Sequence, residues 1–311
     1  MPVSVITVAG EALVDVVHDG AGHVREVPGG GPANVALGLG RLGADVEFAT
    51  WLGPDDRGHR IAEHLAASGV RLVDGAFGAA RTSSATVQLG ADGQPSYVFD
   101  IEWDLPPLRR TPEWLHVGSI GAFLHPGAEA VLAAAERTTA AGGTVSFDPN
   151  IRPALLGTRD GARARFEELA TRATVVKLSD EDAAWLWPTL DPEAVLGSIL
   201  ALGPELAVIT TGASGSVLAT ADERVSVPGE PVEVVDTVGA GDTYTATLVR
   251  QLTGDRAQPT DGSSLGPLDR AALTVLGRTC STAAAITVGR RGADLPTADE
   301  IHLAGAPRAE R

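Results

Sequence analysis

Strand-length apolar runs alternate with longer amphipathic segments along most of the chain, and this alternation constrains the fold more than any other feature. The apolar runs lack strict apolar–polar alternation, which is typical of strands covered on both faces. They lie at Val3–Ala9, Val46–Trp51, Trp114–Gly118, Thr144–Phe147, Thr174–Leu178 and Leu206–Thr210. Helical patterns lie at Ala33–Arg41, Asp56–Ser68, Ala128–Ala141, Arg159–Thr171, Asp180–Trp187, Pro192–Leu202, Gly241–Leu252 and Asp269–Val288. The alternation predicts an α/β fold, with a mainly parallel central sheet between two layers of helices.

Two stretches, Leu13–Pro28 and Thr82–Phe99, depart from this rhythm. Both alternate in the manner of antiparallel strands, and glycines near the middle of each stretch signal a turn. Because both follow early strands of the main sheet, we expect them to form a small sheet that projects from the body as a lid. We therefore predict a single domain over residues 1–311, with the lid formed by about residues 11–31 and 82–103 and inserted in the α/β core.

The charge composition excludes several classes of function. The chain has 24 basic and 40 acidic residues, a formal net charge of −16, and Lys177 is its one lysine. Lys177 follows a valine instead of a glycine-rich loop, so the chain is not a P-loop nucleotide hydrolase. The acidic balance argues against binding to nucleic acid or to anionic membranes. We find no signal peptide or membrane span, and with a single cysteine, Cys280, we expect a cytoplasmic protein.

Small residues gather at the start of a predicted helix in Asp236-Thr237-Val238-Gly239-Ala240-Gly241-Asp242-Thr243, just after the strand-like Val232–Val235. Free backbone N–H groups at a helix start bind anions, and Gly239, Ala240 and Gly241 let a phosphate approach the backbone. Asp242, in the first helical turn, is placed to take a proton from a hydroxyl beside that anion. Phosphoryl transfer requires both roles. A glycine-rich turn with an aspartate cap gives the same pattern.

The same stretch resembles the second signature of the PfkB (ribokinase-like) carbohydrate kinases, and Gly29-Gly30-Gly31-Pro32-Ala33-Asn34-Val35-Ala36 resembles the first. Further segments are similar to family motifs in the same order along the chain: Gly10–Asp15, Arg81–Thr82, His116–Ser119, Asp148–Pro153, Lys177–Asp182, Thr210–Gly215 and Arg290–Ala293. The resemblance implies a ribokinase-like three-layer sandwich with a small β-sheet lid. It also implies ATP-dependent phosphorylation of a sugar primary hydroxyl, with Mg²⁺ as cofactor.

The resemblance assigns catalytic and sugar-binding roles residue by residue. Asp242 would be the general base, and the amides of Gly239, Ala240, Gly241 and Asp242 would bind the transferring phosphoryl group. Arg152 follows a buried strand, at the sheet edge where open α/β folds bind ligands, and would neutralise phosphate charge. Sugar hydroxyls would be held by Asp15, Gly30, Gly31 and Asn34.

The nucleotide and metal sites are implied in the same way. Residues assigned to the nucleotide are Lys177, Ser179, Thr211, Gly212 and Gly215. Ser179 and Asp182 take the place of the family's Asn-x-x-Glu motif, which orders the Mg²⁺ shell, but Ser-x-x-Asp also reads as a helix capping box. Lys177 either lies near phosphate or is a remnant of compositional drift. A monovalent cation, K⁺, would be held by backbone or carboxylate oxygens of Asp236, Val238, Thr287, Arg290 and Gly292.

The segments Gly10–Asp15 and Asp148–Pro153 are more similar to fructokinases and 2-keto-3-deoxygluconate kinases than to ribokinase or adenosine kinase. We therefore predict a fructokinase, with 2-keto-3-deoxygluconate kinase and ribokinase as alternatives. A non-catalytic sugar or nucleotide sensor is the alternative from a different class. The contacts that distinguish sugars are expected in the lid, around Tyr97–Trp103. The expected partners are a small sugar and ATP, and the lid would form a homodimer contact, as in several relatives.

Overall fold

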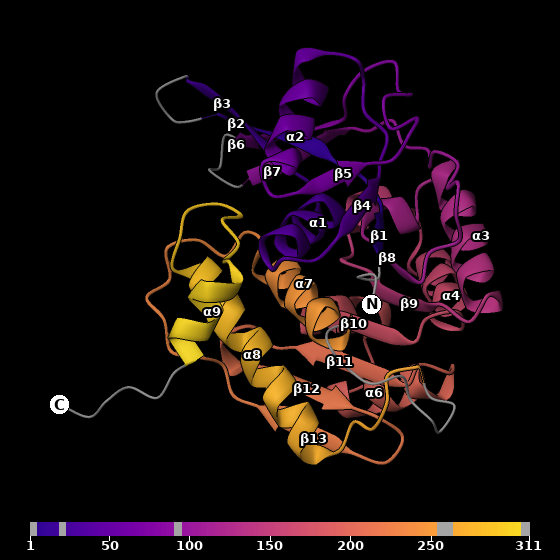
Figure 1. The fold of residues 1–311 in the computed structure, drawn as a ribbon, viewed down its shortest axis with the longest axis vertical. Helices are drawn as coiled ribbons and strands as arrows, with labels where there is room; N and C mark the ends of the chain where they lie inside the picture. Colours follow the sequence, from indigo (N-terminus) through magenta and orange to yellow (C-terminus); the bar gives the residue numbers. More distant parts are fainter. Residues whose placement is uncertain (1–4, 19–22, 90–94, 254–263, 306–311) are drawn as a thin grey trace.

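The computed structural model describes residues 5–18, 23–89, 95–253 and 264–305 (Figure 1). Its central sheet has nine strands in the order β13-β12-β11-β10-β9-β8-β1-β4-β5. The strands are β1 (Ile6–Ala9), β4 (Val46–Ala49), β5 (Val70–Leu72), β8 (Trp114–Gly118), β9 (Thr144–Asp148), β10 (Val175–Ser179), β11 (Leu206–Thr210), β12 (Ser216–Ala219) and β13 (Arg224–Val227). Seven of them are parallel, and β12 and β13 continue the sheet as an antiparallel edge.

Helices cover both faces of this sheet, which confirms the predicted three-layer sandwich. One layer contains α1 (Gly31–Arg41), α2 (Asp56–Ala66), α7 (Ala240–Thr253) and α8 (Arg270–Val288), with α9 (Ala298–Gly305) beside α8 (Figure 1). The other contains α3 (Gly127–Ala140), α4 (Arg159–Ala170), α5 (Asp180–Leu186) and α6 (Pro192–Ala201). Each layer buries its own apolar core: Val8 points into the α1–α7–α8 side, and its neighbour Ala9 into the other.

Local sequence signals explain where several helices begin. An aspartate or threonine precedes the first helical residue, and its side chain accepts a backbone N–H of the first turn. This holds for Asp55, Thr158, Asp191 and Asp269, before α2, α4, α6 and α8. By length and composition alone α8 is apolar enough to cross a membrane, but Leu273, Leu276 and Cys280 are buried against the core and α8 packs along α7.

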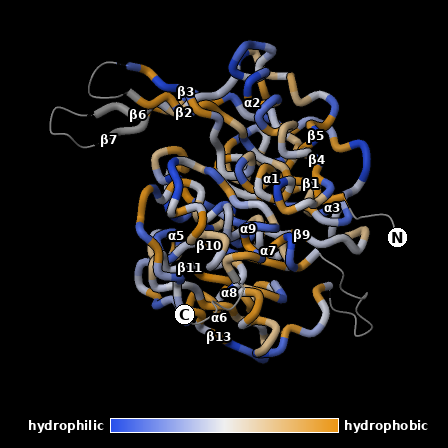
Figure 2. The backbone as a smooth tube through the Cα atoms, turned by 60° about the vertical axis from the view of Figure 1, so that its left-hand side comes forward, coloured by the Kyte–Doolittle hydropathy of each residue, from blue (hydrophilic) through white to orange (hydrophobic). Residues whose placement is uncertain are grey.

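A second, smaller sheet lies apart from the main one, as the two alternating stretches predict. Its strands are β2 (Leu13–His18), β3 (Val24–Gly29), β6 (Ser84–Leu89) and β7 (Pro95–Asp100), in the order β3-β2-β6-β7. Two antiparallel hairpins are joined by parallel pairing of β2 with β6, and the sheet extends away from the helical layers in Figure 2. Leu13, Ala85 and Ile120 form the small apolar cluster at its base.

The order of strands places a crevice at the centre of the molecule. From β1 the chain continues to β4 and β5 on one side, and then returns to build β8 to β11 on the other side. Ligands of open α/β sheets bind at such a reversal, outside the carboxyl ends of the strands. Glu11 follows β1, Ser119 follows β8, and Asn150 follows β9, so their loops meet at this point.

The strand-like run Val232–Val235 is not a strand in the structure, and this prediction is wrong. The segment is irregular, with Val234 65% and Val235 50% exposed. Pro228 and Pro231 precede it and lack the N–H groups that a sheet ladder needs. The segment instead lies along the end of α8, where the Val235 amide donates to the Val288 carbonyl at 3.0 Å.

Candidate active site

The two glycine-rich motifs of the sequence meet at the centre of the molecule. Asn34, in the first turn of α1, donates from Nδ2 to the Oδ2 atom of Asp242, in the first turn of α7, at 2.8 Å across 208 residues of sequence. The two helices pack side by side on the same face of the sheet (Figure 1). Gly30 starts α1 with φ +106°, and a Cβ there would lie 2.8 Å from the Glu11 carbonyl, so only glycine fits.

The turn that starts α7 leaves backbone donors free. Among the described residues, the N–H groups of Gly241 and Asp242 have no acceptor, as is usual for the first turn of a helix. The Thr243 amide and hydroxyl both donate to the Gly239 carbonyl, at 2.8 and 2.9 Å, and fix the turn. Gly239 itself has φ +80° and lies against Ala293. The turn can therefore hold an anion at its open N–H groups.

The electrostatic setting of Asp242 suits a base that acts near neutral pH. Burial of the carboxyl raises the pKa of Asp242 to about 6. The hydrogen bond from Asn34 and the charges of Lys177 and Arg152 lower this pKa, whereas the charge of Asp148 raises it. A carboxyl with such a pKa is ionised at neutral pH yet binds a proton more readily than an exposed aspartate.

Polar side chains surround the start of α1 on the side of the small sheet. The carboxyl of Asp15, on β2, lies directly against Gly29, where any Cβ would overlap it. A Cβ on Gly31 would lie 2.7 Å from Nδ2 of Asn150, which follows β9. Burial raises the pKa of Asp15, and the charge of Arg152 lowers it. The glycines therefore let acidic and amide groups converge on one spot, which suits a ligand with several hydroxyls.

Arg152 lies near this spot, and its charge lowers the pKa of Glu11, Asp15 and Asp242. Its Nη1 atom donates to Asn150, at 3.2 Å to the carbonyl and 2.8 Å to the side-chain oxygen, and to the Ile151 carbonyl at 3.0 Å. Asn150 has φ +38°, a conformation that costs energy for a residue with a side chain. The guanidinium is thus held by its own loop and remains exposed.

The structure adds Glu11 and Asp148, to which the sequence motifs assigned no role. Glu11 is buried; its Oε2 accepts the Gly121 amide at 2.8 Å, and the Ser119 side chain also bonds to the carboxyl. Burial raises the pKa of Glu11 to about 7. Asp148, at the end of β9, is 5% exposed, and its Oδ2 accepts from Lys177 at 2.9 Å and Thr245 at 2.7 Å. Glu11 lies in the segment Gly10–Asp15 and Asp148 in the segment Asp148–Pro153, so the sequence signal for them was their place in these family-like segments.

Of the residues predicted to bind nucleotide, Thr211, Gly212 and Gly215 form one tight turn at the carboxyl end of β11. The Thr211 amide and hydroxyl bond to the Gly215 carbonyl at 2.8 and 3.1 Å. Gly215 has φ +104°, and a Cβ there would overlap the Val227 carbonyl, so internal packing explains this glycine. Gly212 has φ +54° and open space where a Cβ would be, which leaves its backbone approachable by a ligand.

Ser179 and Asp182 form the capping box of α5, which confirms the alternative interpretation of this motif. The Ser179 hydroxyl accepts the Asp182 amide at 3.0 Å, and Asp182 Oδ2 accepts the Ser179 amide at 3.1 Å. Asp182 Oδ1 accepts the Ile151 amide at 2.8 Å and so ties α5 to the loop after β9. Within the described ranges, no three His, Cys, Asp or Glu side chains form a metal-binding group.

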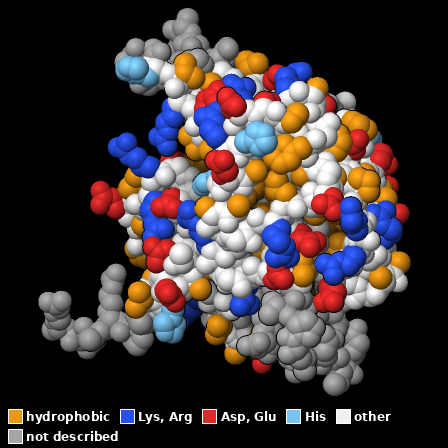
Figure 3. All heavy atoms as spheres, turned by 45° about the horizontal axis from the view of Figure 1, so that its top comes forward, with side chains coloured by type: hydrophobic (Ala, Val, Ile, Leu, Met, Phe, Trp, Pro, Cys, Tyr) orange, Lys and Arg blue, Asp and Glu red, His pale blue; other side chains and the backbone are white. Residues whose placement is uncertain are grey.

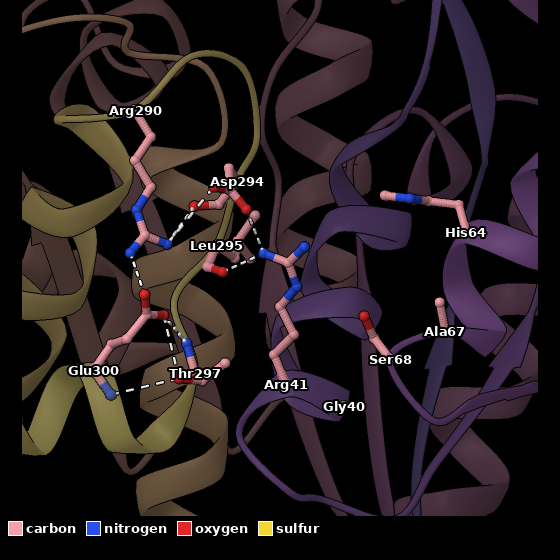
Figure 4. Close-up of a pocket in the computed structure, with 10 residues that line it drawn as sticks. All are labelled: Gly40, Arg41, His64, Ala67, Ser68, Arg290, Asp294, Leu295, Thr297 and Glu300. Atoms are coloured by element: carbon pink, nitrogen blue, oxygen red, sulfur yellow. Dashed lines mark hydrogen bonds and ion pairs between the residues drawn. The ribbon is translucent and has the colours of Figure 1, made fainter.

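The two segments predicted to hold a monovalent cation are brought together. Asp236 accepts the Val238 amide at 3.1 Å and the Gly292 amide at 2.8 Å. Its carboxylate therefore joins the turn before α7 to the loop after α8. Thr287 is buried, and its hydroxyl bonds to that of Thr243 at 2.8 Å. The side chain of Arg290 points towards Glu300, to which it donates a hydrogen bond (Figure 4).

Arg290 lines a separate cavity of about 850 Å³, between the ends of α1 and α2 and the loop before α9. Figure 4 shows the residues that line it. Arg41, from the end of α1, pairs there with Asp294 at 2.7 Å and bonds to the Leu295 carbonyl. The arginines of this cavity are thus paired with acidic and carbonyl groups of the loop and of α9. On the face drawn in Figure 3, basic side chains likewise lie beside acidic ones instead of gathering in one patch.

The residues expected to distinguish sugars do not all face the crevice. Trp103 is 3% exposed; its Nε1 donates to the Gly121 carbonyl at 3.0 Å, and its ring packs against Gly127. This side chain therefore supports the wall behind the site. The side chain of Tyr97 lies outside the part of the structure that is described.

Comparison with known proteins places this geometry among sugar kinases. The model of the pfkB family carbohydrate kinases matches residues 5–300. Fructokinase from Klebsiella pneumoniae is 34% identical over 307 residues, which cover 95% of this chain and 97% of that protein. Fructokinase from Xylella fastidiosa with bound ATP has a TM-score of 0.83 at 27% identity, covering 96% of this chain and 97% of that one. A fructokinase double mutant from Vibrio cholerae O395, with fructose, ADP and potassium ion bound, has a TM-score of 0.82 at 29% identity and coverage of 97% and 98%.

Proposed function

The chain belongs to the pfkB family of carbohydrate kinases, and from this premise we propose that it transfers the γ-phosphoryl group of ATP to the primary hydroxyl of D-fructose, giving fructose 6-phosphate. One observation supports the proposal above all others. Asn34 holds the carboxylate of Asp242 beside free N–H groups of a helix start, so a base and an anion site lie together. Similar proteins named fructokinase bind ATP, or fructose and ADP, on the same fold.

In the proposed reaction Asp242 accepts the proton of the sugar hydroxyl as the oxygen attacks the γ-phosphorus in line. The new P–O bond forms on the sugar while the bond to the β-phosphate oxygen breaks and ADP leaves. The amides of Gly241 and Asp242, in the turn begun by Gly239 and Ala240, donate to the oxygens of the group in transit. Arg152 lies close enough to shift the pKa of Asp242 and supplies positive charge from the sugar side.

The sugar is proposed to lie between the small sheet and the start of α1. Asp15 accepts hydrogen bonds from sugar hydroxyls, and Asn34 both donates and accepts. Gly30 and Gly31 carry no side chain of their own, which lets the ring approach their backbone. Closure of the small sheet over the sugar keeps water, the competing acceptor, away from the γ-phosphoryl group.

The nucleotide is proposed to lie along the turn of Thr211, Gly212 and Gly215, with its phosphates directed to the start of α7. Mg²⁺ bound to the phosphates would neutralise charge on the leaving group. Both oxygens of Asp182 already accept backbone N–H groups, so this carboxylate fits contact with the ion through water. The junction made by Asp236 fits a monovalent cation such as K⁺, held together with oxygens of Val238, Thr287, Arg290 and Gly292.

Other expectations from the sequence remain proposals. The enzyme is proposed to act in the cytoplasm, where ATP is available. It is also proposed to form a homodimer through the small sheet, in which β3 and β7 are the edge strands among the described residues. 2-Keto-3-deoxygluconate and ribose are the competing acceptors. A pure sensor would not need a base, and Asp242 is present with a pKa suited to that role.

The substrate is tested by measuring ADP release with fructose, ribose, 2-keto-3-deoxygluconate and nucleosides under identical conditions. We expect the highest kcat/KM with fructose, and a product that NMR identifies as the 6-phosphate. Strong activity on another acceptor, with none on fructose, would refute the substrate assignment but leave the kinase assignment intact. If the protein binds a sugar tightly but releases no ADP with any of these acceptors, the result would favour the sensor.

A further inference from the structure

The single lysine of this chain is buried beneath the proposed phosphoryl site. Lys177 lies on β10 between Val176 and Leu178, and only 5% of it is exposed. A buried ammonium costs several kcal/mol unless charges and hydrogen bonds compensate it. The other 23 of the 24 basic residues are arginines. A lysine at this place supplies a compact point charge, which a planar guanidinium would not reproduce.

The ammonium is fixed by a carboxylate that also contacts α7. Lys177 Nζ donates to Asp148 Oδ2 at 2.9 Å, and the side chains of both residues are 6% exposed. The same oxygen accepts the hydroxyl of Thr245, in α7, at 2.7 Å. Asp148 Oδ1 is buried and has no hydrogen-bond partner among the described residues. The pair thus joins β9, β10 and the helix whose first turn carries Asp242.

Lys177 also approaches the free amides directly. A Cβ on Gly241 would lie 3.4 Å from Lys177 Nζ. The ammonium therefore lies next to the turn whose N–H groups have no acceptor among the described residues. Because Nζ is also bound to Asp148, we expect its effect on the reaction to pass through Gly241 and Asp242.

The charged groups around Asp242 come from three other segments. They are Asp148 on β9, Lys177 on β10 and Arg152 after β9, and Asn34 on α1 adds a neutral hydrogen bond. Burial lowers the pKa of Lys177, but the carboxylates of Asp148, Asp182 and Asp242 raise it by more, so the group stays an ammonium. One buried cation thus faces several carboxylates.

We propose that Lys177 is a positioning residue for phosphoryl transfer, whose buried ammonium, anchored on Asp148, fixes the turn of Gly241 and keeps Asp242 ionised. This inference rests on the proposed kinase function and deepens it. A cation close to these amides also stabilises the negative charge on the phosphoryl group during transfer. Because Lys177 is buried and its Nζ is bound to Asp148, it acts through its neighbours.

The test uses Lys177→Gln, which removes the charge and retains a donor for Asp148. We expect kcat to fall about tenfold or more, with the KM for fructose changed less than about twofold. The acid limb of the pH profile of kcat/KM should move to higher pH by about half a unit or more. Asp148→Asn should move the limb in the opposite direction, because the charge removed is one that hinders ionisation of Asp242.

Thr245→Val is the matched control, because it removes the other hydrogen bond to Asp148 without changing any charge. We expect its acid limb to stay in place. The ionisation of Asp242 can be followed without turnover by NMR of carboxyl groups labelled with ¹³C-aspartate, assigned with Asp242→Asn, so the result does not depend on fructose being the substrate. An unchanged limb and an unchanged Asp242 titration in Lys177→Gln would overturn the proposal. If that variant does not fold, an unchanged titration in Asp148→Asn would overturn it.

Discussion

At the scale of single residues, the site is a set of acidic groups whose ionisation depends on their burial. Glu11, Asp15 and Asp242 all have a raised pKa because they are buried, and the charge of Arg152 lowers the pKa of all three. Among the three, Asp242 alone lies in the first turn of α7 beside free N–H groups. These positions support the proposed division of roles, in which Asp242 acts on the hydroxyl and Asp15 holds the sugar.

The pKa of Asp242 sets the acid limit of activity. A general base works only when ionised, so kcat/KM should fall as pH decreases through about 6. Initial rates of fructose-dependent ADP release between pH 4.5 and 8 measure this limb. Asn34→Ala removes the hydrogen bond that lowers the pKa of Asp242, and should shift the limb to higher pH. A limb near pH 4 in the unmodified enzyme would contradict this account of the base.

Glu11 makes the stability of the fold depend on pH. Its pKa is about 7 in the folded chain and 4.5 in the unfolded one, so the folded state binds the proton more tightly. The free energy of unfolding should therefore decrease as pH rises from about 4.5 to 7. Glu11→Gln, which retains an acceptor for Gly121, should be more stable than the unmodified chain at pH 8 by about 3 kcal/mol. At pH 4 the two should be equal; urea unfolding curves that differ equally at both pH values would exclude this role.

At the scale of elements, the periodicity of the sequence was sufficient for the main helices and the buried strands. The runs at Trp114–Gly118 and Leu206–Thr210 match β8 and β11 residue for residue, because strands covered on both faces are continuous apolar runs. Three strands and α9 were not predicted. The strands β5, β12 and β13 are three or four residues long and, unlike the equally short β1 and β4, do not lie inside a longer apolar run.

At the start of α5, Ser179 caps the helix, whereas the family resemblance implied a role in ordering the Mg²⁺ shell. If Ser179 serves the fold as a helix cap, Ser179→Ala should cost about 1 kcal/mol in unfolding free energy and leave the ATP and Mg²⁺ requirements within about twofold. Thr158→Ala, at the cap of α4, is a matched control away from the site. Denaturant curves and ATP titrations compare the two variants. A large rise in the Mg²⁺ requirement of Ser179→Ala alone would show that the hydroxyl serves the metal shell.

At the scale of the whole molecule, the active site depends on contacts that sequence patterns do not encode. The hydrogen bond from Asn34 to Asp242 joins the first and last thirds of the chain, and only the packing of α1 against α7 creates it. The family resemblance identified both residues, but the hydrogen bond between them could be found only from the folded structure. The same is true of Lys177: its sequence position left two explanations open, and only the fold shows that it is buried against Asp148.

The central claim is that Asp242 is the base of an ATP-dependent fructokinase, and one variant tests it most directly. Asp242→Asn keeps the size of the side chain and removes its ability to accept the proton. We expect calorimetry to show that fructose still binds, while fructose-dependent ADP release falls about 100-fold or more. Turnover equal to that of the unmodified enzyme would contradict the account.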